Sequence, residues 1–418
     1  MLLNDYICAL DIGSSKIAVA LAEIRKRKLA NIYFDSLPIK TVKEGVIVDS
    51  AGLTNAISKT LKSLKSKSGV KIKFVSVNIS GQDIVTKHSH AIIPLAERGN
   101  KVISVSDMQL VNEQARVLGS SLEDEIIHMI PQGYNIDSKN NIINPLGLYS
   151  HKLEVDLYLV CARLSSVQSL SRVINQSGYE IKDLFFSGIA TSKAVFSSHL
   201  KDGVNLLCDL GSDTSEILIF EDGLLKGIEI INLGGDNLTR ELSEALKIPL
   251  DLAEDIKRSY GIIGNPLDIG EDKEILVKKS EFYKPIKQRV VCEILTSAAD
   301  KICAQIKDAV EKKTAIYQLN NFIIVGRTIL LDGFIENLER FLNVQVKLGR
   351  ITNLEIVSLI KETSELSGQK YLKYVTCLGM LSEALEKKPL GIRSLHQPAK
   401  NLAIKVFNKV KEVYQEYF

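Results

Sequence analysis

The feature that most constrains this chain is a local pattern that occurs twice. Residues 6–10 form an apolar run that ends at Asp11, and a glycine follows two residues later. Residues 16–24 then have the alternating pattern of a second strand that returns from the turn. Residues 204–208, Asp209 and residues 215–220 repeat this order in the second half. Each copy predicts a strand, a tight turn and a returning strand. A duplicated turn of this kind predicts two similar lobes that face one ligand.

The turns also indicate what that ligand is. Gly13 and Gly211 allow the backbone to turn closely, so the amides of each turn can point at an anion such as a phosphate. Asp11 and Asp209 would then face each other across a cleft and would need a cation between them. Mg²⁺ held through its waters is the simplest choice on charge balance. A single turn of this type is also ordinary hairpin chemistry, so the duplication carries the interpretation.

Composition sets the broad class of protein. A chain of 418 residues with 45% hydrophobic and 25% charged residues predicts two or three globular domains. The formal net charge of +3 gives no chain-wide basic field, so we do not expect a nucleic-acid partner. The amino terminus does not resemble a secretory signal, and no apolar run is long enough to span a membrane. The six scattered cysteines are expected to be buried thiols in a reducing cytoplasm.

Residues 81–163 have a different texture and are predicted to be an insertion. The predicted helices and strands, inside the insertion and outside it, are a helix at 51–64, strands at 74–79, near 91–94, at 126–136 and at 153–161, helices at 237–245, 249–259 and 281–312, and a strand at 322–325. Two helix starts are predicted from capping boxes, one at Ser106 and one at Ser165.

A third chemical element follows the strand at 322–325. Gly326, Arg327 and Thr328 form a loop before the next helical pattern, and a base or ribose could pack against it. With the two turns, this set resembles the actin, sugar-kinase and heat-shock-chaperone ATPase superfamily, with two phosphate loops and an adenosine loop in that order. The expected fold class is therefore α/β. It is an actin-like two-lobed ATPase fold with an inserted α+β subdomain in the first lobe and a C-terminal amphipathic helix.

Within that superfamily, the chain resembles the FtsA family of bacterial cell-division proteins over essentially its whole length. The stretches that carry the resemblance, besides the loops, are residues 43–46 with Asp49, 77–81, 128–132 with Tyr134, Ile136 and Asp137, 144–148, 187–190 and 378–379. The domains that it implies are a first-lobe core at 1–82, 164–202 and 376–388, an inserted subdomain at 83–163, a second-lobe core at 203–248 and 316–375, a small subdomain at 249–315, a linker at 389–400 and a membrane-targeting helix at 401–418.

The resemblance also implies the cofactors, ATP and Mg²⁺, and their contacts. Asp11 and Asp209 would hold the metal. The residues expected at the nucleotide are Asp11, Gly13, Ser14, Ser15, Lys16, Asp209, Gly211, Ser212, Asp213, Thr214, Gly234, Gly235, Asn237, Glu254, Lys257, Gly326, Arg327 and Thr328. Glu254 and Lys257 are also spaced as an ordinary solvated ion pair on a helix. No catalytic residue is assigned.

Two of these positions depart from the family pattern. Asp213 stands where phosphate loop two usually has glycine, and Arg327 stands where the adenosine loop usually has a second glycine. Aspartate tolerates a left-handed turn, but its carboxylate would repel the β- and γ-phosphates unless it shares the metal. Arg327 could stack on adenine or block it. Slow or absent hydrolysis is therefore expected.

The last residues form one apolar stripe at helical spacing. Its members are Leu402, Val406, Phe407, Val410, Val413, Tyr414, Tyr417 and Phe418. Lys405, Lys409 and Lys411 flank it, after a linker that contains Pro389 and Pro398. Such a helix can lie in a membrane surface that contains anionic lipid, although the stripe alone also suits a helix docked on the protein's own core. The resemblance favours the membrane.

The function that follows is that of an adaptor on the cytoplasmic face of the cell membrane at the division site. ATP would close the lobes, the closed form would assemble head to tail, and the last helix would tether the FtsZ ring. The inserted subdomain would contact other division proteins. FtsZ is expected on the small subdomain, where Lys284, Lys287 and Arg289 were predicted to start a helix. The alternatives are an actin-like pilus-assembly adaptor and a small-molecule kinase of the same superfamily.

Overall fold

The computed structural model describes residues 5–25, 28–96, 99–137, 139–196, 202–269, 274–279, 282–361 and 366–386. The predicted linker at 389–400 and terminal helix at 401–418 lie outside these residues. Within the described part of the chain, no helix combines the length and the apolar character needed to cross a membrane.

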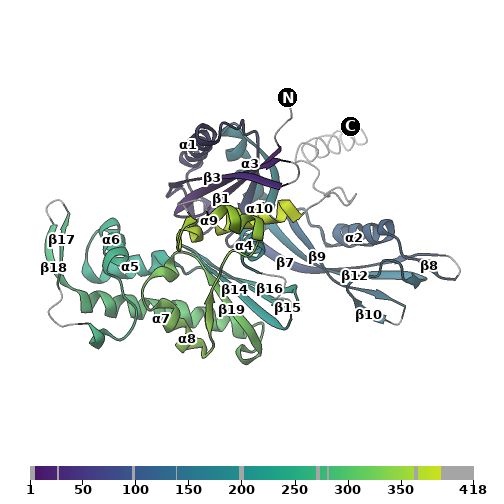
Figure 1. The fold of residues 1–418 in the computed structure, drawn as a ribbon. Helices are drawn as coiled ribbons and strands as arrows, with labels where there is room; N and C mark the ends of the chain where they lie inside the picture. Colours follow the sequence, from purple (N-terminus) through teal and green to yellow (C-terminus); the bar gives the residue numbers. More distant parts are fainter. Residues whose placement is uncertain are drawn as a thin grey trace, which may run out of the picture.

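Two five-stranded sheets with the same topology form the centre of the molecule (Figure 1). The first has the order β13-β6-β1-β2-β3, and the second has the order β20-β19-β14-β15-β16. The strands are β1 (Asp5–Ile12), β2 (Lys16–Arg25), β3 (Lys28–Pro38), β6 (Phe74–Ile79), β13 (Glu180–Phe186), β14 (Val204–Leu210), β15 (Ser215–Glu221), β16 (Leu224–Ile231), β19 (Leu319–Val325) and β20 (Val346–Leu348).

In each sheet, three consecutive strands form an antiparallel meander and two later strands add in parallel. The two predicted hairpins, β1–β2 and β14–β15, are confirmed by their registers. The third strand of each meander, β3 and β16, was not predicted. Asp35 and Ser36 interrupt the apolar pattern of β3, which is paired on one side only.

The duplicated sheets bury both of their faces. In β1, Cys8 and Leu10 pack into a core with α1 (Ser50–Ser68) and α3 (Leu164–Gln176), while Ala9 packs into the core between the sheets. In β14, Leu207 faces the same central core, and Cys208 faces the helices of the second lobe. A strand buried on both faces has no polar side, which explains the continuous apolar runs in the sequence.

Two helices, α4 (Ser187–Val195) and α10 (Val375–Glu386), cross within the central core between the lobes. A Cβ atom added to Gly379 would lie 1.7 Å from the carbonyl oxygen of Ala190. The glycine therefore allows the two helix backbones to touch.

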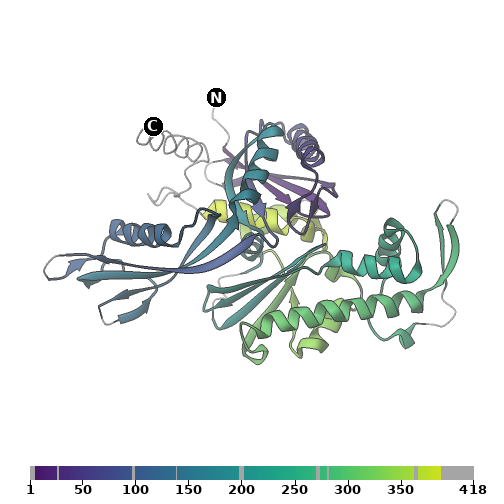
Figure 2. The ribbon, with the colours of Figure 1, turned by 180° about the vertical axis from the view of Figure 1, so that it is seen from behind.

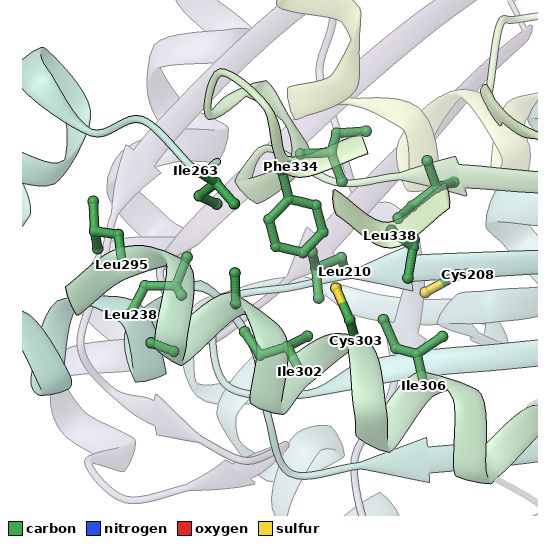
Figure 3. Close-up of a cluster of buried hydrophobic side chains, with 14 of the residues drawn as sticks. Cys208, Leu210, Leu238, Ile263, Leu295, Ile302, Cys303, Ile306, Phe334 and Leu338 are labelled. Carbon is green, nitrogen blue, oxygen red and sulfur yellow. The ribbon is translucent and has the colours of Figure 1, made fainter. Parts of the chain in front are cut away.

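The second lobe has a large core under its sheet (Figure 3). Leu295, Ile302 and Ile306 of α7 (Gln288–Glu311) point toward Phe334 and Leu338 of α8 (Phe334–Leu342). Viewed from behind, α7 runs beneath the sheet and out to a small group of helices and strands (Figure 2). That group contains α5 (Gly235–Leu246), α6 (Leu250–Tyr260), β17 (Glu274–Lys279) and β18 (Phe282–Lys287).

The helix predicted over 281–312 begins only at Gln288. Residues 282–287 instead form β18, which pairs antiparallel with β17. Pro285 removes a backbone donor and disfavours a helix at this position. Lys284 therefore lies in a strand, and the prediction that it starts a helix was wrong. Lys287 at the helix cap and Arg289 in the first turn do lie at the start of α7.

A four-stranded sheet in the order β10-β9-β12-β7 projects from the first lobe, on the opposite side from α5 and α6 (Figure 1). Its strands are β7 (Ile84–Pro94), β9 (Asp124–Ile136), β10 (Lys139–Ile142) and β12 (Lys152–Arg163). Its core is shared with Val111 and Ala115 of α2 (Val105–Gly119). The short strands β8 (Lys101–Val102) and β11 (Tyr149–Ser150) pair separately.

Both predicted capping boxes were wrong. The box at α2 is formed by Ser104 and Asp107, two residues before the predicted start at Ser106. Helix α3 has no side-chain cap, because β12 runs directly into it and Arg163 occupies the cap position. The six cysteines are all buried, as expected.

Candidate functional site

The two duplicated turns have the same backbone geometry. The amide of Gly13 donates to the carbonyl of Lys16 at 3.0 Å, and the amide of Gly211 donates to the carbonyl of Thr214 at 3.0 Å. A Cβ atom on Gly211 would lie 2.6 Å from the oxygen of Thr214. Only glycine allows the second turn to close this tightly, as expected from the sequence.

Asp11 ends β1 deep in the first lobe, with 6% of its surface exposed. Its carboxylate accepts a hydrogen bond from the side-chain amide of Asn78 at 2.9 Å and pairs with the ammonium of Lys16 at 3.2 Å. Lys16 also donates to the carbonyl of Lys373, at the entry to α10, at 2.6 Å. Lys16 therefore ties the first turn to a distant part of the chain.

Asp209 occupies the equivalent place at the end of β14 and accepts from the hydroxyl of Thr191 at 3.1 Å. Burial raises the pKa of Asp209 to about 6, and the negative charge of Asp11 adds to this, while Thr191 and Lys16 oppose it. The two predicted metal-binding carboxylates, Asp11 and Asp209, are therefore close enough for the charge of one to affect the pKa of the other. Burying a second carboxylate near Asp11 without a cation costs free energy, first through the lost hydration of Asp209 and then through the like charge.

A third acid, Glu216, was missed by the sequence analysis. It lies directly across the sheet from Asp209, is 4% exposed, and has a buried Oε2 atom with no hydrogen-bond partner. Burial and the charges of Asp209 and Asp11 raise its pKa well above the ordinary value. The signal in the sequence was an acidic residue directly before the apolar run at 217–220 of β15.

These three acids fit a cation. An unpartnered buried carboxylate oxygen beside two further carboxylates is the environment that a divalent ion would stabilise. In the described part of the chain, no three histidine, cysteine or acidic side chains are grouped as direct metal ligands. The arrangement therefore suits Mg²⁺, which usually keeps several of its waters.

The start of α5 lies directly under the second turn. The amide of Gly235 donates to the carbonyl of Gly211 at 3.0 Å, and that of Asp236 donates to the carbonyl of Ser212 at 2.8 Å. A Cβ atom on Gly234 would lie 2.4 Å from the oxygen of Ser212. The predicted segment 234–237 is thus packed against the turn, with Asn237 accepting from the amide of Gly234 at 2.9 Å.

The predicted adenosine loop meets the same two segments. Gly326 has a φ of 108°, and a Cβ there would lie 2.1 Å from the carbonyl oxygen of Leu210. Thr328 donates to the carbonyl of Gly211 at 3.3 Å. The loop, the second turn and the start of α5 therefore form one packed unit.

Glu254 and Lys257 of α6 also belong to this unit. The Lys257 ammonium lies 2.6 Å from Glu254, donates to the carbonyl of Gly235 at 2.9 Å and is 7% exposed in all. Burial lowers the pKa of Lys257, and Glu254 opposes that shift. The pair is therefore a buried link between α6 and α5, in contrast to the solvated ion pair that the spacing alone also allowed.

Arg327 is exposed. Desolvation and the neighbouring charge of Arg258 lower its pKa, while Glu254 opposes the shift. Ser14 and Ser15 are half-buried in the first turn, where the carbonyl of Ser15 accepts from the amide of Ile39 at 3.1 Å.

Asp213, where the resemblance implies a glycine, has a partner outside its own turn. Its carboxylate accepts a hydrogen bond at 3.2 Å from the amide of Glu44, which belongs to the other lobe. The side chain is 8% exposed. The carboxylate therefore has a protein partner across the cleft in addition to its neighbours in the turn.

Comparisons with known proteins give one consistent result. A family model described as "Cell division protein FtsA" matches residues 206–379, and one described as "SHS2 domain inserted in FTSA" matches residues 81–161. The cell division protein FtsA of Pseudomonas aeruginosa is 23% identical over 393 residues, which cover 93% of this chain and 91% of that protein. The FtsA of Borreliella burgdorferi is 25% identical over 83% of this chain and 84% of its own length.

Solved structures show the same fold. A chain of the PilM-PilN type IV pilus biogenesis complex superposes with a TM-score of 0.63 at 15% identity, covering 91% of this chain and 99% of that chain. MreB 5 of Spiroplasma citri bound to AMPPNP superposes with a TM-score of 0.52 at 11% identity, covering 91% and 97% of the two chains. The actin-like fold expected from the sequence is confirmed.

Proposed function

The chain belongs to the FtsA family of cell division proteins, and from this premise we propose that it is an ATP-binding adaptor that tethers the division apparatus to the membrane. The nucleotide would lie between the duplicated turns and the loop at Gly326. The observation that carries this proposal is the proximity of the Asp11 and Asp209 carboxylates at the ends of equivalent strands, with the buried Oε2 atom of Glu216 lacking a hydrogen-bond partner beside them. That Spiroplasma MreB 5 was solved with AMPPNP supports a nucleotide in such a fold.

In the proposed site, Mg²⁺ would neutralise the acids and the phosphates together. Asp11 and Asp209 would hold its waters, and the amides of the turns at Gly13 and Gly211 would contact phosphate oxygens. Lys16 would add one positive charge beside Asp11. The packed unit of Gly235, Lys257 and Thr328 would position the nucleoside.

Membrane attachment is proposed for residues 401–418, on the apolar stripe and flanking lysines of the sequence. FtsZ would bind the small subdomain near Lys287, which is exposed, and Arg289, which pairs with Glu293 at 3.4 Å. Other division proteins would bind the inserted sheet, and copies of the chain would assemble head to tail. The proposed location is the cytoplasmic face of the membrane at the division site.

Co-sedimentation with liposomes tests this function. The full chain and a chain that ends at Pro398 are mixed with anionic liposomes, with and without Mg²⁺-ATP and FtsZ. We expect the full chain to sediment and to bring FtsZ with it, and the truncated chain to stay in the supernatant. If both chains stay in the supernatant, the tether is wrong. If the full chain sediments but never brings FtsZ, the division partner is wrong.

A pilus-assembly adaptor is the second candidate, because a chain of the PilM-PilN complex shares the fold over nearly its whole length. The matches to FtsA over most of the sequence favour division. A small-molecule kinase of the superfamily is less suited, because no side chain is assigned as the base that such a reaction needs.

A further inference from the structure

A short hairpin of the first lobe reaches the second turn. It consists of β4 (Val42–Lys43), β5 (Val46–Ile47) and the turn at Glu44 and Gly45. Both turn residues are left-handed, with φ of 51° at Glu44 and 85° at Gly45. A two-residue hairpin turn needs positive φ at both of its positions, and this is uncommon for a residue such as Glu44.

The surroundings at this turn are the backbone of residues 80–81. A Cβ atom on Gly45 would lie 2.4 Å from the oxygen of Ser80, and one on Gly81 would lie 2.5 Å from the oxygen of Glu44. Two glycines therefore hold the hairpin against its own lobe. The packing fixes the direction in which the Glu44 amide points.

That amide points across the cleft at Asp213, whose Oδ2 atom is 3.2 Å from the Glu44 nitrogen. A second bond joins the lobes nearby, where the side-chain amide of Gln82 donates to the Asn232 side chain at 2.6 Å. The lobes are thus held together at the second turn by the protein's own groups.

The second turn also carries more negative charge than a phosphate site should. Asp236 lies beside Asp213, and the hydroxyl of Ser212 donates to it at 2.7 Å. Burial raises the pKa of Asp236, and the charge of Asp213 raises it further. An outer phosphate bound at this turn would meet the negative charge of these carboxylates, which would weaken its binding.

We propose that the Asp213 carboxylate takes the place of the terminal phosphate, latches the lobes through the Glu44 amide, and makes the site prefer a nucleoside diphosphate to a triphosphate. A carboxylate and a phosphate are both acceptors for a backbone amide, and one amide cannot fully serve both. The inference rests on the proposed nucleotide site.

The latch is tested by hydrogen–deuterium exchange of the full chain without nucleotide. The amide of Glu44 should exchange slowly in the natural chain and about tenfold faster in Asp213→Gly, which removes the acceptor. Asp213→Asn keeps an acceptor oxygen, so the exchange rate of the Glu44 amide in this variant should lie between the rates in the natural chain and in Asp213→Gly. Glu221→Gln, which removes one charge at the far, exposed end of β15, should leave the exchange unchanged. Equal exchange at Glu44 in all four proteins would overturn the latch.

The preference is tested with Mg²⁺-ADP and Mg²⁺-ATP by calorimetry on the same four proteins. The natural chain and Glu221→Gln should bind ADP about tenfold more tightly than ATP. In Asp213→Asn and Asp213→Gly, the two affinities should approach each other through tighter ATP binding. An unchanged ratio would refute the preference while leaving the nucleotide site intact. If no protein binds either nucleotide, the proposed function itself fails, and the exchange result alone decides the latch.

Discussion

The side-chain amide nitrogen of Asn78 lies 2.9 Å from Oδ1 of Asp11 and donates a hydrogen bond to that carboxylate. The same nitrogen lies 2.8 Å from the hydroxyl of Ser187, and the side-chain oxygen of Asn78 accepts from the amide of Ile12 at 2.7 Å. Asn78 is 3% exposed, so water cannot easily replace it. One side chain therefore connects β6, the first turn and α4.

The first prediction concerns this connection. Replacing Asn78 by Ala leaves the Ile12 amide and the Asp11 carboxylate buried with fewer partners, which should lower the free energy of unfolding by about 2–4 kcal/mol. Urea denaturation measures the change. Ser66→Ala, which removes an exposed hydroxyl bonded only within α1, should stay within about 0.5 kcal/mol of the natural chain. If Asn78→Ala lowers the free energy of unfolding no more than Ser66→Ala does, the hydrogen bonds of Asn78 do not stabilise the fold and the prediction is wrong.

The second prediction is a dependence of stability on pH at Asp209. Its pKa is 3.8 in an ordinary environment and about 6 in the folded chain, so the folded state binds this proton more tightly than the unfolded state does. The stability that the proton provides is present below about pH 4 and is lost as the pH rises through 6. Asp209→Asn removes the titration and keeps an acceptor for Thr191.

The free energy of unfolding of Asp209→Asn, relative to the natural chain, should therefore rise with pH, by about 3 kcal/mol between pH 4 and pH 7 without Mg²⁺. Urea titrations at several pH values measure it. Asp222→Asn, at an exposed hairpin turn, is the matched control and should show no such trend. A difference that stays constant with pH would mean that Asp209 is ionised throughout this range.

The duplicated turns could be predicted from sequence because they are local. The Asp, the Gly and the flanking apolar runs lie within a few residues of each other, and each copy folds as its own hairpin. Glu216 could not be found this way, because its role depends on the register that places it across from Asp209. The bond between Glu44 and Asp213 depends on how two lobes meet, which no local pattern encodes.

Local patterns predicted the wrong cap for α2 and the wrong start for α7, because at each place the sequence allows two structures. Ser104 and Ser106 both precede α2, and Ser104 is the cap because Asp107 lies at the third position after it and returns the bond. The helical spacing in the sequence extends back to position 281, yet residues 282–287 pair with β17. Strand pairing is a long-range choice, and it overrides a short apolar periodicity.

The third prediction concerns the buried pair on α6. Lys257→Met leaves Glu254 without its buried ammonium, and should lower the free energy of unfolding by about 3 kcal/mol. Adding Glu254→Gln should recover part of that loss, because it removes a carboxylate that would otherwise keep only the exposed Arg258 as its charged partner. Arg258→Met is the control, since the Arg258 side chain is 61% exposed and its pair with Glu254 should be worth under about 1 kcal/mol. Equal losses for the two single variants would contradict the buried link.

The fourth prediction concerns the helix crossing between the lobes. A methyl group added in Gly379→Ala would overlap the Ala190 carbonyl, 1.7 Å away, so α4 and α10 must move apart. The backbone of one helix cannot yield as a side chain can, and the loss should exceed about 3 kcal/mol. Gly227→Ala is the matched control, because its Cβ would meet only the side chain of Lys313 at 3.5 Å. Urea denaturation compares the two.

The same crossing should matter for nucleotide binding. Helix α4 carries Thr191, which bonds to Asp209, and Lys16 bonds to the entry of α10. Gly379→Ala should therefore also weaken binding of Mg²⁺-ADP, whereas Gly227→Ala should not. If the free energy of unfolding falls equally in both variants, the close contact between Gly379 and Ala190 adds no loss of its own, and the prediction is wrong.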